Sequence, residues 1–177
     1  MSDRDPLLER FRSAAALVGT EVCQTSRESL VEILEPLAEA GGTGLDHDLL
    51  TSYPEVAPLA RRSEAWPAVA MSLATLAVAD TGSLALAEQD PQDRARRVLC
   101  RRHVVVVPVE RVVPSLQDAA GPIRRWAREG RVYVTLVTGP SRTADIEKIL
   151  TVGAHGAIEV IAVVLDDGAG GGDGTVS

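Results

Sequence analysis

The residues from 138 to 147 bring together the side chains best suited to chemistry. They read Thr-Gly-Pro-Ser-Arg-Thr-Ala-Asp-Ile-Glu, so hydroxyl and carboxylate groups follow a glycine and a proline. The preceding residues 132–137 are mostly apolar and β-branched, which predicts a strand buried on both faces of a parallel sheet. Ile146, Ile149 and Leu150 recur at helical spacing, so we expect a helix to follow the turn. The free N–H groups of its first turn would favour an anion at the carboxyl end of the sheet.

The same segment also has a purely structural interpretation. Ser141 or Thr143 would cap the helix by accepting bonds from its first N–H groups, and Asp145 would offset the positive end of the helix dipole. Every helix has to satisfy these N–H groups, so the residue types alone favour the cap.

Two further segments stand upstream and downstream of this stretch. Residues 78–84 read Val-Ala-Asp-Thr-Gly-Ser-Leu, and residues 152–156 read Val-Gly-Ala-His-Gly. With Arg96 or Arg97 and His103 between them, the three segments resemble the LUD-domain family, and within it the lactate utilisation protein C group. The resemblance implies a fold similar to the NagB/RpiA/CoA-transferase-like proteins.

The order of the predicted elements leads to the same fold class. Apolar runs alternate with helical patterns after residue 70, with strands expected at 84–87, 103–107 and 158–165 and helices at 72–79, 91–100 and 114–127. Such alternation predicts an α/β fold, a three-layer α/β/α sandwich with a largely parallel sheet.

Convergence of the three segments would surround an oxyanion with hydroxyl groups and glycine N–H groups. We therefore expect ligand contacts from residues of the matching segments: Asp80, Thr81, Gly82, Ser83, Arg97, His103, Gly139, Ser141, Arg142, Thr143 and Gly156. The sharpest prediction is that Asp80–Ser83, Ser141–Asp145 and His155 form one pocket at the carboxyl ends of the strands.

The candidates for a catalytic role are His155, Asp145 and Glu147. An imidazole gains or loses a proton near neutral pH, and carboxylates can accept one. The alternative is that His155 only donates a hydrogen bond to a backbone carbonyl, while the neighbouring glycines turn the chain back into the sheet.

The resemblance implies a non-cluster accessory subunit of an iron-sulfur-dependent L-lactate oxidation system. Cys23 and Cys100 cannot supply the four ligands of a cluster, so iron-sulfur clusters are expected only in partner subunits. The three histidines have no metal-ligand spacing, and we expect neither a metal nor a cofactor in this chain. The alternative is a stand-alone enzyme or sensor for a small phosphorylated or CoA-linked metabolite, as the fold relatives suggest.

The charge balance excludes one class of partner and favours another. A net charge of −7 argues against general nucleic-acid binding, which needs concentrated positive charge. The basic stretch of arginines between residues 94 and 102 is the local exception. Such a run is usually a solvated helix face, but an inward arginine would hold a carboxylate or phosphate in bidentate geometry.

The length of 177 residues suits one domain with a sizeable core. We expect the domain to span residues 1–167, with an N-terminal helical segment at 1–40, loops and short helical turns at 41–68, and the best-matching core at 69–167. The glycine-rich residues 168–177 are expected to be a disordered tail. The charged start and the absence of a long apolar stretch predict a cytoplasmic protein without a leader or a membrane span.

Overall fold

The computed structural model describes residues 4–39, 41–62, 66–88, 90–131, 133–144, 150–152 and 156–167. The helices are α1 (Arg4–Leu17), α2 (Leu30–Leu34), α3 (His47–Ser52), α4 (Pro91–Leu99) and α5 (Leu116–Arg128), with 3-10 helices η1 (Glu35–Leu37), η2 (Pro54–Leu59) and η3 (Val109–Arg111). The strands are β1 (Thr20–Thr25), β2 (Thr43–Leu45), β3 (Val69–Leu73), β4 (Leu76–Val78), β5 (Ser83–Glu88), β6 (Arg102–Pro108), β7 (Val112–Val113), β8 (Tyr133–Val137), β9 (Arg142–Ala144), β10 (Leu150–Val152) and β11 (Glu159–Leu165).

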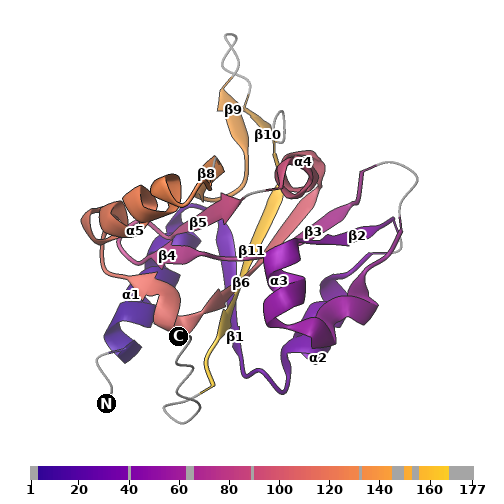
Figure 1. Ribbon diagram of the computed structural model, residues 1–177, viewed down its shortest axis with the longest axis horizontal. Coiled ribbons are helices and arrows are strands. Elements are labelled where there is room, and N and C mark those ends of the chain that lie inside the picture. The colour runs from indigo at the N-terminus through magenta and orange to yellow at the C-terminus, as the bar shows by residue number, and fades with distance from the viewer. Residues whose placement is uncertain are drawn as a thin grey trace.

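A five-stranded parallel sheet forms the centre of the fold (Figure 1). Its order is β1-β11-β6-β3-β2, and Val104 of β6 pairs with Ile161 of β11 and Met71 of β3. The consecutive valines of β6 are fully buried because both faces of this sheet are covered. The predicted strands at 103–107 and 158–165 are thus confirmed.

The two faces of the parallel sheet are covered differently. On one face, Leu30 of α2, Leu49 of α3 and Val56 of η2 pack in one core with Met71 and Val104. The other face packs on α1 and on a second sheet, through side chains that include Leu8, Phe11, Ala70, Leu84, Leu86, Val105 and Ala162. Alternate residues of β6 therefore enter different cores.

The second sheet has the order β7-β4-β5-β8 and includes the antiparallel pairs β4–β5 and β5–β8. Its outer face is covered by α5, whose Ala119 and Trp126 share a core with Leu76, Val78 and Ala85. The layers in Figure 1 are therefore short helices, the parallel sheet, the second sheet with α1 beside it, and α5. The β9–β10 hairpin projects beyond both sheets (Figure 1).

The α/β class and the mostly parallel sheet with flanking helices are confirmed, whereas the second sheet was not predicted. The expected helix at 72–79 is wrong, because this segment contains β4 and the end of β3. The strand at 132–137 was expected to be parallel and buried, but β8 pairs antiparallel with β5 and leaves Leu136 44% exposed. The helix expected after residue 141 is also wrong where the chain is described, because β9 and β10 pair there as a hairpin.

Residues 41–68 were expected to hold loops and short helical turns, and α3 and η2 confirm the helical turns. Asp46 is the residue that attaches α3 to the parallel sheet. Its Oδ1 accepts a bond from Leu49 N at 2.7 Å, and its Oδ2 accepts one from Leu73 N at 3.1 Å. One buried carboxylate thus caps the helix and satisfies a backbone group at the end of β3.

Two glycine turns make close contact with the C-terminal part of α1. Gly82 and Gly139 have positive φ values of +65° and +79°. A Cβ at Gly82 would overlap the backbone of Ala15, and a Cβ at Gly139 would overlap the carbonyl of Val18. Both positions therefore need glycine for backbone conformation and for space.

We predict that Gly82→Ala lowers the free energy of unfolding by about 3 kcal/mol, from the left-handed alanine together with overpacking against α1. The matched control is Gly121→Ala inside α5, where a Cβ meets nothing within 4 Å apart from its neighbours in the chain. That change should alter the free energy of unfolding by less than about 1 kcal/mol, because the helix propensity of alanine is opposed by crowding of its Cβ against Pro122. Urea unfolding of both variants checks the pair, and equal effects would contradict the close contact.

Candidate functional site

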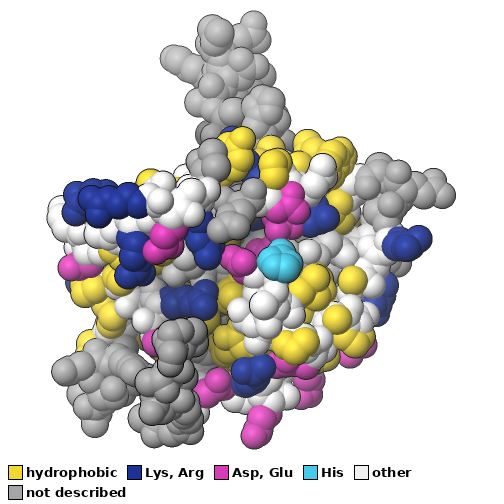
Figure 2. Space-filling view, viewed as in Figure 1, with side chains coloured by type: hydrophobic (Ala, Val, Ile, Leu, Met, Phe, Trp, Pro, Cys, Tyr) yellow, Lys and Arg dark blue, Asp and Glu magenta, His cyan; other side chains and the backbone are white. Residues whose placement is uncertain are grey.

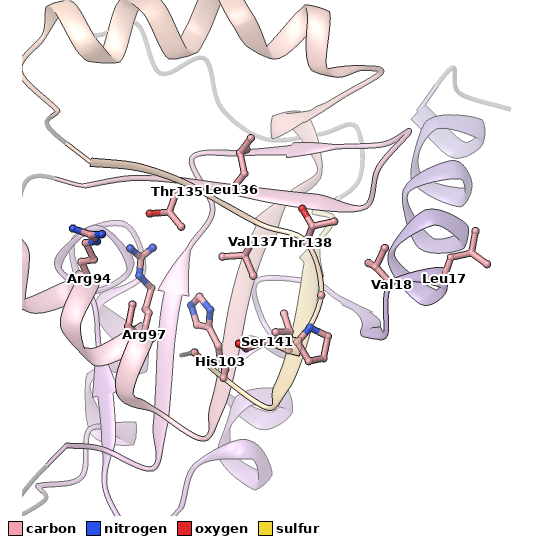
Figure 3. Close-up of a pocket in the computed structure, with 16 residues that line it drawn as sticks. Leu17, Val18, Arg94, Arg97, His103, Thr135, Leu136, Val137, Thr138 and Ser141 are labelled. Carbon is pink, nitrogen blue, oxygen red and sulfur yellow. The ribbon is translucent and has the colours of Figure 1, made fainter. Parts of the chain in front are cut away.

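A cavity of about 690 Å³ lies between β8, α4, the end of α1 and the amino ends of β6 and β11 (Figure 3). Arginine, hydroxyl, glycine and apolar residues line it together: Leu17, Val18, Arg94, Arg97, Val98, His103, Thr135, Leu136, Val137, Thr138, Gly139, Pro140, Ser141, Gly156, Ala157 and Val160. No carboxylate occurs among these described lining residues.

Helix α4 supplies the positive charge of the cavity. The helix begins where Asp90 Oδ1 accepts a bond from Gln92 N at 2.8 Å, with Pro91 in its first turn. Arg94 and Arg97 are three residues apart and so lie on one side of the helix. Arg97 is only 6% exposed, while Arg94 is exposed. The α4 helix thus directs one buried and one accessible guanidinium to the same cavity.

The neighbours of these arginines have other roles. The guanidinium of Arg94 stacks over the ring of Tyr133, 4.8 Å from its centroid, which fixes its direction beside β8. Arg96 forms an ion pair with Asp93 and is not part of the cavity lining. Of the two arginines in the matching segment, Arg97 is therefore the one at the cavity.

His103 is a buried, neutral part of the cavity lining. It is 2% exposed, and its Nε2 lies 3.0 Å from Oγ of Ser72. Burial and, to a smaller extent, the nearby charge of Arg97 together lower the pKa of His103 to about 3. The imidazole therefore contributes polar atoms at neutral pH and no charge.

A chain of hydroxyl groups joins two of the sequence segments. Oγ of Ser83 lies 2.8 Å from Oγ1 of Thr81 and 2.8 Å from Oγ1 of Thr138. Ser141 is held by its backbone N–H, which donates to the carbonyl of Ala157 at 2.9 Å. The turn after β8 is thus bonded both to the start of β5 and to the residues before β11.

A comparison with known protein families identifies the family of this chain. Residues 60–165 match the model of the LUD domain, which is more than half of the chain. The chain belongs to the LUD domain family.

Curated relatives of this LUD domain share a modest identity with it. The Lactate utilization protein C of Geobacillus thermodenitrificans (strain NG80-2) is 26% identical over 93% of this chain and 80% of that protein. The namesake from Macrococcus caseolyticus (strain JCSC5402) is 26% identical over the same shares. The one from Shouchella clausii (strain KSM-K16) is 31% identical over 56% of this chain and 44% of that protein.

A solved structure shares the fold of this LUD domain. The crystal structure of a DUF162 family protein from Deinococcus radiodurans superimposes with a TM-score of 0.70. The match covers 94% of this chain and all of that chain, at 19% sequence identity. The likeness therefore concerns the fold alone.

The structure brings several predicted site residues together. Arg97, His103, Gly139, Ser141 and Gly156 all line the one cavity of the LUD domain described above. A Cβ at Gly156 would lie 3.3 Å from Cβ of Ser141, so two of the segments meet there. Ligand contact by these residues stays a prediction.

The Asp80–Ser83 turn lies next to the cavity without lining it. Thr81 and Ser83 reach the cavity only through Thr138, while Gly82 packs on α1. Asp80 is exposed and is not among the described lining residues, so its contact with a ligand stays a prediction.

Other predicted site residues are not described. Asp145, Glu147 and His155 lie outside the described residues, as does the tail from residue 168. Arg142 and Thr143 belong to β9, of which only the backbone is described. The catalytic candidates therefore stay predictions.

The predicted location of the pocket needs correction. The pocket was expected at the carboxyl ends of the parallel strands. His103 is the second residue of β6 and Val160 is the second residue of β11, so the cavity lies at the amino ends of these strands. The expectation failed because β8 was assigned to the parallel sheet. Among the described residues, only the turn after β8, in the second sheet, reaches the cavity from a carboxyl end.

Sequence reasoning missed much of the lining, including Leu17, Val18, Arg94, Thr135 and Leu136. A usable signal existed for Arg94, which is one helical turn before Arg97. Alternation along the edge strand β8 would have found Thr135 only after that strand was recognised as half-exposed, and Leu17 and Val18 at the end of α1 gave no such signal. No helix in the described part of the chain has the length and apolar character to cross a membrane, and none of its His, Cys, Asp and Glu residues gather in a group able to hold a metal.

We predict that His103→Gln makes the protein less sensitive to acid. The pKa of His103 is depressed to about 3, so the unfolded chain binds a proton below about pH 6.5 that the folded chain does not. The wild-type unfolding free energy should therefore fall, relative to the variant, by roughly 1 kcal/mol per pH unit between pH 6 and 4.

Urea unfolding at several pH values in this window measures the difference. Burial raises the pKa of Asp46 to about 6, so its contribution to stability is lost as the pH rises through 6, with the opposite slope. Asp46 is present in both proteins, so their difference isolates His103. A pH-independent difference would contradict the assignment of a neutral buried histidine.

Proposed function

We propose that this LUD domain is a non-cluster accessory subunit of an iron-sulfur-dependent L-lactate oxidation system in the cytoplasm. Its contribution is a folded site for a small organic anion, and the clusters belong to its partner subunits. Support comes from the relatives named Lactate utilization protein C, two of which align with nearly the whole chain.

The observation that carries the proposal is the charge of the cavity. The chain as a whole has a net charge of −7, yet its described cavity lining contains two arginines and no acidic residue. A positive cavity inside an acidic protein selects anions and repels cations. Arg97 can hold a carboxylate through paired N–H groups, and its burial strengthens the attraction.

The other lining groups would orient the anion after it binds. The hydroxyls of Thr135 and Ser141 can donate to its oxygens, and Gly139 and Gly156 keep the backbone close to the cavity. His103 would offer a neutral donor or acceptor, because its pKa lies far below neutral pH. These groups supply recognition without adding or removing charge.

A second function is favoured by the size of the cavity. About 690 Å³ falls in the range of about 300–1,000 Å³ that holds drug-sized ligands. Lactate would fill little of it. The alternative is therefore a stand-alone enzyme or sensor for a larger phosphorylated or CoA-linked metabolite.

Affinity purification from cells grown on lactate tests the partnership. Tagged protein should recover cluster-bearing subunits, recognised by the iron and acid-labile sulfide of the eluate. If the eluate contains this chain alone, and if deletion of its gene leaves growth on lactate unchanged, the accessory-subunit proposal is wrong.

We predict that Arg97→Gln fails to restore growth on lactate in a deletion strain, because the buried cation of the cavity is lost. The matched control is Arg125→Gln, which removes the same charge from an exposed residue of α5 paired with Glu129. The control should restore growth fully. Equal growth of the two strains, at equal protein levels on immunoblots, would show that the cavity has no part in this function.

A further inference from the structure

The cavity has chemically different sides. In Figure 3 the guanidinium groups of Arg94 and Arg97 lie on one side, whereas Leu17 and Val18 at the end of α1 lie on the opposite side. Val137 of β8 lies between them. A ligand that spans the cavity would therefore meet cations at one end and hydrocarbon at the other.

Apolar side chains are also unusually exposed around this cavity. Leu17 is 86% exposed, Leu136 44% and Val98 43%, and all three line it. Figure 2 shows apolar side chains gathered over α4 beside the base of the β9–β10 hairpin, where Val98 and Leu99 are exposed. Exposed apolar surface that adjoins a cavity indicates a binding site, because a folded chain gains nothing by leaving it in water.

We propose that the cavity binds an amphipathic organic anion. Its carboxylate or phosphate head pairs with Arg97 and Arg94, and its apolar body of several carbon atoms lies along Val137 and Val18. This inference rests on the anion-binding part of the proposed function and names the ligand class of the same site.

The charge and the volume together exclude simpler ligands. A free inorganic anion would satisfy the arginines and leave most of the 690 Å³ in water. A neutral hydrocarbon would cover the apolar wall but offer no oxygen to the guanidinium groups of Arg94 and Arg97. Only a ligand with both parts matches both sides of the cavity.

Titration calorimetry of the full chain with a series of straight-chain acids tests the proposal. Butanoate, hexanoate and octanoate carry the same head on bodies of increasing length. Burial of each added methylene should lower the Kd about four-fold, since one CH₂ contributes about 0.8 kcal/mol. Octyl phosphate distinguishes a preference for phosphate from one for carboxylate, and octanol tests the need for charge.

Matched variants assign the two ends of the ligand. Arg97→Gln and Arg94→Gln should each raise the Kd for octanoate at least ten-fold, whereas Arg125→Gln on α5 should leave it unchanged. Val18→Ser should flatten the dependence of Kd on chain length, and Leu116→Ser, at an exposed leucine outside the cavity, should not. Arg94 is exposed and Val18 is partly exposed, so their variants keep the test valid if Arg97→Gln does not fold.

Three results would overturn the inference. If lactate binds as tightly as octanoate, and Arg97→Gln weakens both, the anion site stands but the apolar subsite does not exist. If octanol binds as tightly as octanoate, the arginines do not recognise the head. If none of the compounds binds, the anion-binding part of the proposed function fails with it, while the partnership in lactate oxidation is tested separately by purification.

Discussion

The rest of the structure depends on the close contact between α1 and two glycine turns. Gly82 and Gly139 both follow a threonine, and both bring their backbone to the C-terminal part of α1 with no room for a side chain. Ser83, next to the first glycine, bonds to Thr138, which precedes the second. These contacts fix β5 and β8 against α1.

This contact also determines where the cavity is. Held by Gly139, the turn after β8 places Ser141 beside Gly156 and leaves Val18 at the far wall. The second sheet therefore stands over the amino ends of β6 and β11 with a gap between them. The Thr-Gly pairs that resemble ligand loops in the sequence have a structural role, and the cavity lies beside them.

The sequence predicted those parts of the fold that depend on local pattern. Consecutive valines identified β6, and Pro91 marked the start of α4. The family resemblance predicted that Arg97, His103 and Ser141 lie at one site, and all three line the cavity. The prediction failed for segments whose structure is determined by tertiary contacts. The apolar run of β8 looks like a buried strand, yet it is an edge strand beside the cavity, and Leu76–Val78 is a strand because β5 and β7 pair with it.

The electrostatics of the cavity could be predicted only in part. The sequence left two interpretations of the arginines of α4, a solvated helix face or an inward arginine that would hold an anion, and the structure shows that Arg97 is buried. The low pKa of His103 follows from burial and from the charge of Arg97, which lie together only in three dimensions. As a result, the two arginines keep the described lining at the same charge from neutral pH to well below the usual pKa of histidine.

A crystal structure with 8-bromooctanoate is the most direct test that the cavity is an anion site with an apolar subsite. The anomalous signal of bromine locates the end of the chain independently of the carboxylate. The account predicts the carboxylate at Arg97 and Arg94 and the bromine beside Val137 or Val18. Bromine at the arginines, or a ligand bound only outside this cavity, would contradict it.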